Sequence, residues 1–270
     1  MENIEKFVRV DLHNHLAHDN LKCFEREKFL NKVIDKSYDT LGDGGVVGLA
    51  NCVEPYGRYE KFTELSGYER VEFENALYFP EKKILVVKAQ EVFADKGDIL
   101  ALGIPKNYHI GKLGEVRKRS IEDAIKQAKD LGAIIGIDHG CFIDGAIPYL
   151  RKNLKLLEDV DFIEPHNGNA WIPHPKYFRA NKQAQEFYRE VLKEFPHLGG
   201  ISSSDGHSVF EIGSSYSSLD MKIEDDLTES LRKAIRNHKD WSRDKMSNSY
   251  LGAGIHAGLM LLFQKKPESN

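Results

Sequence analysis

The sequence predicts an α/β fold, a parallel sheet covered by helices that is either open or closed into a barrel. Short apolar runs of strand character alternate with longer segments whose apolar residues recur at helical spacing. This alternation is typical of parallel strands joined by helices that pack on the sheet. No internal repeat, low-complexity stretch or linker interrupts the chain, so we expect one domain over residues 1–270.

The N-terminal half contains four predicted strands, at residues 7–12, 46–50, 84–89 and 99–104. A helix is expected at 25–41, where apolar residues share one face until the glycines from Gly42 onward end it. A second helix follows Ser120, which begins a Ser-x-x-Asp capping box. Residues 54–81 are ambiguous, with a short helix near 59–65 and either helix or strand at 71–79.

The C-terminal half continues the alternation, with strands expected at 133–137, 160–163 and 199–201. Helices are expected at 146–157, 182–194 and 227–237. The apolar, glycine-rich segment at about 249–264 is expected to close against the sheet.

Composition excludes some classes of protein. The hydrophobic fraction of 41% supports a sizeable core, and the net charge of -4 does not suit a protein that coats nucleic acid. No apolar run is long enough to cross a membrane, and the N-terminus is not a signal peptide. Three widely spaced cysteines argue against a disulfide framework and predict a reducing, cytoplasmic location.

The first predicted strand ends in two histidines, His13 and His15, separated by one residue. In a strand, positions i and i+2 point to the same side, so both imidazoles can face one point beyond the strand. Imidazole is the commonest metal ligand near neutral pH. The pair alone is equally compatible with a structural role, but similar residues close later strands.

These residues are Glu91, His139, Asp205 and His207. In α/β folds the carboxyl ends of the strands carry the chemistry. Imidazoles with carboxylates suit zinc, manganese or iron better than calcium or magnesium. Because there are more ligands than one tetrahedral zinc ion needs, we expect two or three divalent ions bridged by Glu91. Such a cluster favours phosphoester hydrolysis by a metal-bound hydroxide.

Several ordered blocks resemble the polymerase and histidinol phosphatase (PHP) family of metal-dependent phosphoesterases. They are Asp11-Leu12-His13-Asn14-His15, Ala89-Gln90-Glu91 followed by Gly97–Gly103, Ile137-Asp138-His139-Gly140, and Ser204-Asp205-Gly206-His207-Ser208 followed by Ile212-Gly213. They span residues 10 to about 217. The resemblance implies a single-domain, distorted TIM-like barrel of seven strand–helix units, (β/α)7, with up to three metal ions at the strand ends.

The resemblance also implies residue roles. The metal ligands expected are His13, His15, Asp19, Glu91, Asp98, His139, Asp205 and His207. The expected catalytic residues are Glu91, near the attacking hydroxide, His139 and His207, with a histidine or a metal-bound water protonating the leaving oxygen. Three positions depart from the family pattern: His18 or Asp19 must serve in a shortened loop, Asn51 replaces a histidine, and Asp98 replaces another.

Candidate substrate contacts are Asn167, Asn169 and Arg179. Glu164 and His166 could be further ligands or could orient a ligand imidazole. The expected substrate is a small-molecule phosphoester or a nucleotide, and a nucleic-acid end stays open. Two alternatives remain: another barrel metal hydrolase, either an amidohydrolase or a TatD-like nuclease, and a catalytically degenerate binding module.

Overall fold

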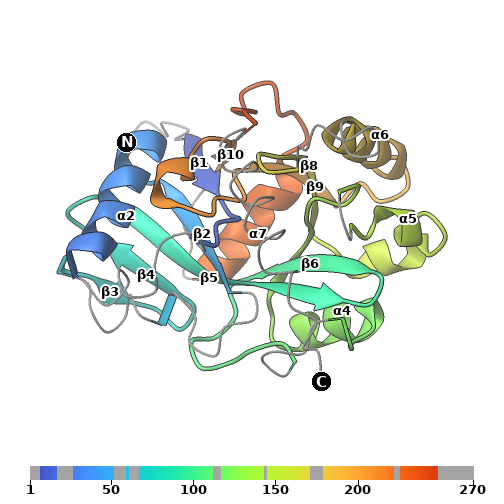
Figure 1. Ribbon diagram of the computed structural model, residues 1–270, viewed down its shortest axis with the longest axis horizontal. Helices are drawn as coiled ribbons and strands as arrows, with labels where there is room; N and C mark the ends of the chain where they lie inside the picture. The colour runs from blue at the N-terminus through green and yellow to red at the C-terminus, as the bar shows by residue number, and fades with distance from the viewer. Residues whose placement is uncertain are drawn as a thin grey trace, which may run out of the picture.

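A mixed sheet curls into a nearly closed barrel in the computed structural model (Figure 1). The structure describes residues 7–16, 27–51, 59–60, 67–111, 117–142, 145–170, 179–221 and 226–248. The strands are β1 (Phe7–Asp11), β2 (Val46–Asn51), β3 (Val71–Glu72), β4 (Ala76–Phe79), β5 (Ile84–Ala94), β6 (Gly97–Leu102), β7 (Ile134–Ile137), β8 (Phe162–Asn167), β9 (Gly199–Ser203) and β10 (Ser217–Asp220). Their order is β10-β1-β2-β5-β6-β7-β8-β9, with the β3–β4 hairpin attached to β5.

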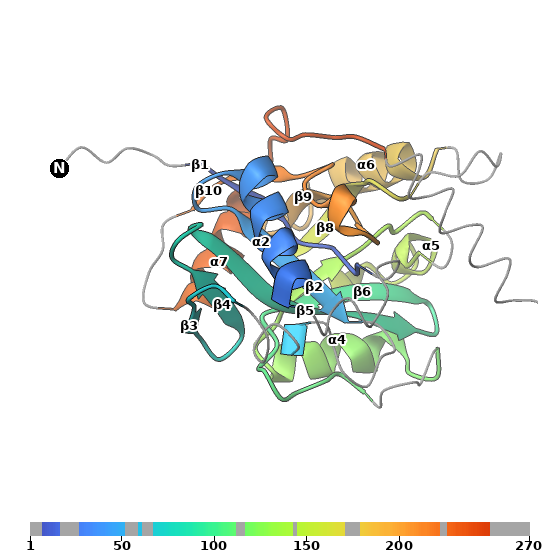
Figure 2. The same ribbon diagram turned by 60° about the vertical axis from the view of Figure 1, so that its left-hand side comes forward.

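Helices surround the sheet, as the two views in Figures 1 and 2 show. They are α2 (Glu27–Leu41), α4 (Ile121–Asp130), α5 (Ile147–Leu150), η1 (Leu154–Asp159), α6 (Ala180–Val191), η2 (Val209–Glu211) and α7 (Leu227–Asn237). Helix α2 packs on β1, β2 and β5, α4 on β6 and β7, and α6 on β8. The Ser120 side chain accepts a hydrogen bond from the Asp123 N–H, which confirms the predicted cap of α4.

Period-two alternation divides each strand between the barrel interior and the outer helices. Along β5, Leu85, Val87 and Ala89 belong to the interior cluster, whereas Val86 packs among the outer residues near α2. The same alternation directs Glu91 into the interior, at the carboxyl end of the barrel. Glu91 was predicted to lie just past the end of a strand, but β5 continues through it to Ala94.

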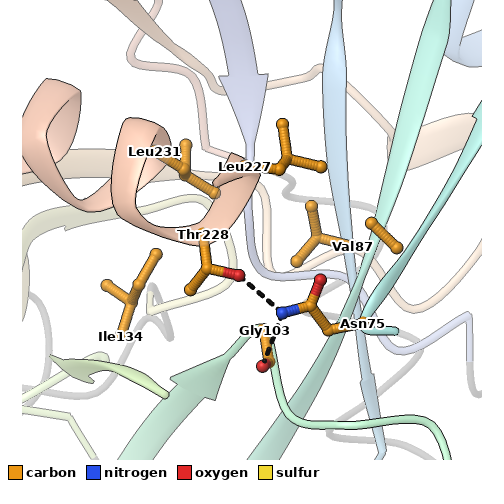
Figure 3. A pocket seen from close by; sticks show the side chains of 8 residues that line it. Asn75, Val87, Gly103, Ile134, Leu227, Thr228 and Leu231 are labelled. Carbon is orange, nitrogen blue, oxygen red and sulfur yellow. Dashed lines mark hydrogen bonds between the residues drawn. The ribbon is translucent and has the colours of Figure 1, made fainter. Parts of the chain in front are cut away.

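Helix α7 closes the other end of the barrel. Its Leu231, Ala234 and Ile235 belong to the same buried cluster as the inward residues of β1 and β5. A small, mainly apolar cavity lies there, where the Asn75 amide donates hydrogen bonds to Thr228 and to the Gly103 carbonyl (Figure 3). This end of the barrel therefore carries mainly packing residues.

The sheet is not entirely parallel, which corrects the expectation of a parallel sheet with a helix after each strand. Strands β5 and β6 form an antiparallel hairpin, and β6 also pairs antiparallel with β7. The hairpin turns at Gly97, whose φ of +132° is open to glycine and strained for other residues. As a result, Asp98 at the start of β6 lies at the same end of the barrel as Glu91. The helix expected at 146–157 is also divided, into α5 and η1.

The barrel is closed between β1 and β9 partly by a side chain. The buried Asp11 carboxylate accepts hydrogen bonds from the Ser204 N–H at 3.0 Å and the Gly213 N–H at 2.8 Å. Just beyond the strands, the Gly206 carbonyl accepts from the N–H groups of His15 and Leu16. Asp11 therefore fixes the ends of the strands that carry His13 and Asp205.

We expect Asp11→Asn to lower the free energy of unfolding by about 1–3 kcal/mol, because an amide has one acceptor oxygen and leaves one buried N–H unpaired. Urea denaturation at pH 8 measures the change, since burial raises the pKa of Asp11 to about 6 and the carboxylate is then ionised. Asp220→Asn, at the exposed end of β10, is the matched control. Equal stability of the two variants would contradict this role.

Candidate metal centre

Histidine and carboxylate side chains converge at the carboxyl end of the barrel. Among the residues that the structure describes, their ligand atoms form three overlapping groups, and within each group all atoms lie within 4.8 Å of one another. The groups are His13, His15 and Asp205; His13, Glu91 and Asp138; and Glu91, Asp98 and His139. Six predicted ligands are thus brought together from β1, β5, β6, β7 and the segment after β9.

The two histidines after β1 face each other. The Nδ1 atom of His13 lies 3.2 Å from a Glu164 oxygen, and that of His15 lies 3.2 Å from the Ala50 carbonyl oxygen. Both acceptors require a proton on Nδ1, so each Nε2 presents a lone pair. The two Nε2 atoms are 2.9 Å apart. Only a cation, either a proton or a metal ion, can satisfy both lone pairs.

Two carboxylates complete the surroundings of these imidazoles. The Asp205 Oδ1 lies 3.6 Å from His13 Nε2 and 3.4 Å from His15 Nε2. Glu91 places one oxygen 3.3 Å from His15 Nε2 and the other 2.8 Å from His139 Nε2. Glu91 therefore lies between His15 and His139 and contacts both, as a carboxylate that bridges two metal ions would.

Buried polar atoms without a protein partner show that these residues fit a metal. Within the described part of the chain, neither oxygen of Asp138, nor Asp205 Oδ1, nor His139 Nδ1 has a hydrogen-bond partner. Leaving buried polar atoms unpaired is costly. Asp205 also has a left-handed backbone, with φ +52°, which aspartate tolerates better than most residues. Divalent ions would satisfy the carboxylate oxygens of Asp138 and Asp205 together.

The charges at this end of the barrel are strongly coupled. Burial alone would lower the pKa of His13, but the carboxylates of Asp205 and Glu164 raise it to about 10. Burial raises the pKa of Asp205 to about 7, against the effect of the His13 and His139 imidazoles. Although burial opposes it, the His15 and His139 imidazoles hold the pKa of Glu91 well below its usual range.

His207 lies beside the three groups. Its Nδ1 donates to the Asp205 carbonyl at 2.7 Å, which leaves Nε2 as the ligand atom, and its ring lies 5.1 Å from that of His15. The Asn169 amide donates to the same carbonyl. Asn169, expected to contact substrate, therefore also supports the segment that holds Asp205 and His207.

The other residues that the sequence singled out do not all lie at the candidate metal centre. Asn167 is buried and hydrogen-bonds Glu164, Asn169 and Ala170. Arg179 is exposed just before α6. His166 bonds the Ser247 carbonyl and contributes to none of the three groups. His18, Asp19 and the closing segment at 249–264 lie outside the described residues, and their roles stay predictions.

Sequence reasoning missed Asp138 and left the role of Glu164 open. Alternation along the strands could have found both: Ile134, Gly136 and Asp138 share one face of β7 and its extension, and Phe162 and Glu164 share one face of β8. Gly136 makes room for Phe162, since an added Cβ would lie 2.1 Å from that ring. Both carboxylates therefore point into the barrel.

We expect Glu164→Gln to weaken metal binding roughly 10–100-fold, the usual effect of losing the carboxylate that orients a ligand histidine. The Glu164 side chain accepts from His13, Asn167, Ser203 and the His139 N–H. Isothermal titration with Mn²⁺ measures the affinity. The exposed Glu158→Gln is the control, and equal affinities would show that Glu164 does not orient His13.

Comparisons with known proteins found similar structures and one family model that matches part of the chain. Residues 178–234 match a family model described as PHP-associated, and no curated protein sequence matches the chain. PsfC from Pseudomonas syringae is similar in structure at 12% identity, with a TM-score of 0.60 over 96% of this chain and 98% of its own.

Two longer structures are also similar. One is a two-domain protein from Bacteroides vulgatus with a predicted PHP-like metal-dependent phosphoesterase, at 18% identity and TM-score 0.53. The other is a lesion-specific endonuclease from Pyrococcus furiosus, at 16% identity and TM-score 0.55. This chain covers 64% and 56% of their lengths, and they cover 87% and 86% of it.

Fold and site define a distorted TIM-like barrel that gathers histidines and carboxylates at the strand ends, as predicted. The PHP-associated match over residues 178–234 and the similarity in fold to a PHP-like structure agree with the resemblance seen in the sequence. In the described part of the chain, no helix has both the length and the apolar character to cross a membrane.

Proposed function

We propose that this protein is a metal-dependent phosphoesterase that hydrolyses a phosphate ester of a small molecule or nucleotide. The observation that carries the proposal is the pair of imidazole lone pairs, 2.9 Å apart, with the Asp205 and Glu91 carboxylates beside them. Buried ligand atoms held in this way bind divalent cations, and zinc, manganese or iron suits the mixture of imidazoles and carboxylates.

Two ions can be assigned to this chain's residues. His13, His15 and Asp205 would hold one, with His207 beside it. Glu91 and Asp138, the two carboxylates of the second group, would contribute to the other, with His139 beside Glu91. When bound, divalent ions so placed supply a water molecule of lowered pKa and neutralise charge on a phosphoryl group.

The protein's own groups would position these ligands and move protons. Glu164 and the Ala50 carbonyl fix the tautomers of His13 and His15, and the Asp205 carbonyl fixes that of His207. His139, whose Nε2 lies 2.8 Å from Glu91, and His207 are candidates to protonate the leaving oxygen, a role open only to an imidazole that is not bound to an ion. Asn169 and Arg179 remain candidate substrate contacts.

The test combines metal analysis with turnover. Protein purified without chelator is analysed for zinc, manganese and iron, then assayed with p-nitrophenyl phosphate, bis-p-nitrophenyl phosphate and a DNA duplex containing an abasic site. We expect two ions per chain and hydrolysis of a small ester that chelator abolishes and added metal restores.

Other outcomes would redirect the proposal. Turnover of the duplex alone would make a nucleic acid the substrate, an outcome for which the structural similarity to an endonuclease is a reason to test. Absence of bound metal, with no turnover after Mn²⁺ or Zn²⁺ is added, would instead support a degenerate binding module.

A further inference from the structure

An arginine lies at the edge of the candidate metal centre. Two guanidinium nitrogens of Arg117 each lie 3.4 Å from a different oxygen of Asp98, and one of them also lies 3.2 Å from the Ala94 carbonyl oxygen. This two-pronged geometry is the one that guanidinium groups adopt with carboxylates. Asp98 is buried, and it belongs to the third potential metal group, with Glu91 and His139.

Arg117 is held in place from its backbone to its side chain. Its N–H donates to the Phe93 carbonyl at 3.1 Å, and the guanidinium lies 5.9 Å from the Phe93 ring centroid. Two residues further along, the Arg119 carbonyl accepts from the Asp95 N–H. The segment is therefore fixed along the end of the β5–β6 hairpin. Arg117 also has a left-handed backbone, with φ +57°, a conformation that clusters at functional positions in non-glycine residues.

The ion pair changes what Asp98 can do. A metal ion in the third group would have to share the Asp98 carboxylate with a fixed positive charge, and like charges a few ångströms apart repel strongly when partly buried. The other carboxylates of the cluster, Asp138 and Asp205, have oxygens without hydrogen-bond partners in the described structure. Asp98 differs from them in having the permanently charged guanidinium of Arg117 beside it.

We propose that Arg117 takes the place of a third cation, so that the centre binds two divalent ions and Asp98 is a partner of Arg117 instead of a metal ligand. The inference rests on the proposed function only in treating the cluster as a metal centre. It assigns Arg117 as the residue that limits the number of ions.

Metal stoichiometry tests this independently of activity. Wild-type, Asp98→Asn, Arg117→Gln and Arg117→Lys proteins are equilibrated with excess Mn²⁺, freed of unbound metal, and analysed by elemental analysis and native mass spectrometry. We expect two ions in the wild type and in Asp98→Asn, three in Arg117→Gln, where Asp98 becomes available, and two in Arg117→Lys, which keeps the charge. Lys118→Gln removes an exposed neighbouring charge and should keep two.

Other metal stoichiometries would overturn the inference. Three ions in the wild type, with one lost in Asp98→Asn, would make Asp98 a ligand and overturn the inference while leaving the proposed function intact. Two ions in a folded Arg117→Gln protein, as judged by its circular dichroism and melting temperature, would show that the guanidinium does not exclude a third ion. A wild-type chain that binds no metal would overturn both the inference and the proposed function.

Discussion

Asp205→Asn is expected to remove most of the bound metal and with it the turnover. The Asp205 carboxylate faces His13 and His15 at 3.6 and 3.4 Å, and a neutral amide oxygen is a much weaker ligand. Substituting a residue that only orients a metal ligand already lowers metal affinity 10–100-fold. Because Asp205 would itself be a ligand, we expect its loss to lower metal affinity by at least roughly 100-fold. Asparagine is chosen because it tolerates the left-handed backbone at this position.

Two readouts separate this effect from misfolding. Metal titration gives the affinity, and the rise in melting temperature on adding Mn²⁺ reports binding without any assay of activity, because a ligand that binds the native state stabilises it. Asp220→Asn at the exposed end of β10 is the matched control. If Asp205→Asn kept wild-type metal content and turnover, the segment after β9 would not belong to the centre.

Glu91→Gln is expected to have the largest effect on turnover. The two Glu91 oxygens face different histidines, His15 at 3.3 Å and His139 at 2.8 Å, and Glu91 belongs to two of the three groups. A glutamine has one oxygen and turns its NH₂ group toward an imidazole, so it cannot bridge. A bound ion contributes several kcal/mol of transition-state stabilisation, so we expect its loss to lower kcat/KM on the order of 10³-fold.

Metal content distinguishes bridging from a role in the chemistry alone. We expect Glu91→Gln to bind fewer than two ions per chain at Mn²⁺ concentrations that saturate the wild type. The exposed Glu74→Gln on the β3–β4 turn makes the same change away from the centre. A Glu91→Gln protein that binds two ions with unaltered affinity, yet is inactive, would make Glu91 a catalytic group and not a bridge.

Much of the centre could be predicted from local patterns. His13 and His15 are two residues apart at a strand end, and His139 and Asp205 also follow strands, so their approximate placement needed only the alternation of elements. The Ser120 cap and the bounds of α7 were predicted for the same reason, because capping and helical periodicity are encoded within a few residues.

Tertiary structure alone decided how those residues are paired. Glu164 orients His13 across 151 positions of sequence, and Asp11 joins the segment that carries Asp205 across 193. No local pattern specifies such partners, because they depend on how the strands are ordered around the barrel.

The direction of β6 had the greatest consequence. The sequence predicted a strand at 99–104, and the structure has one at Gly97–Leu102. The turn at Gly97 and pairing with both β5 and β7 decided that this strand runs antiparallel. That direction brings Asp98 to the end of the barrel where the candidate metal ligands gather, and Arg117, fixed along the end of β5, meets it there. The types of the candidate ligands and their places at strand ends were thus determined by the sequence alone. Which charged groups face one another in the centre depended on long-range strand pairing.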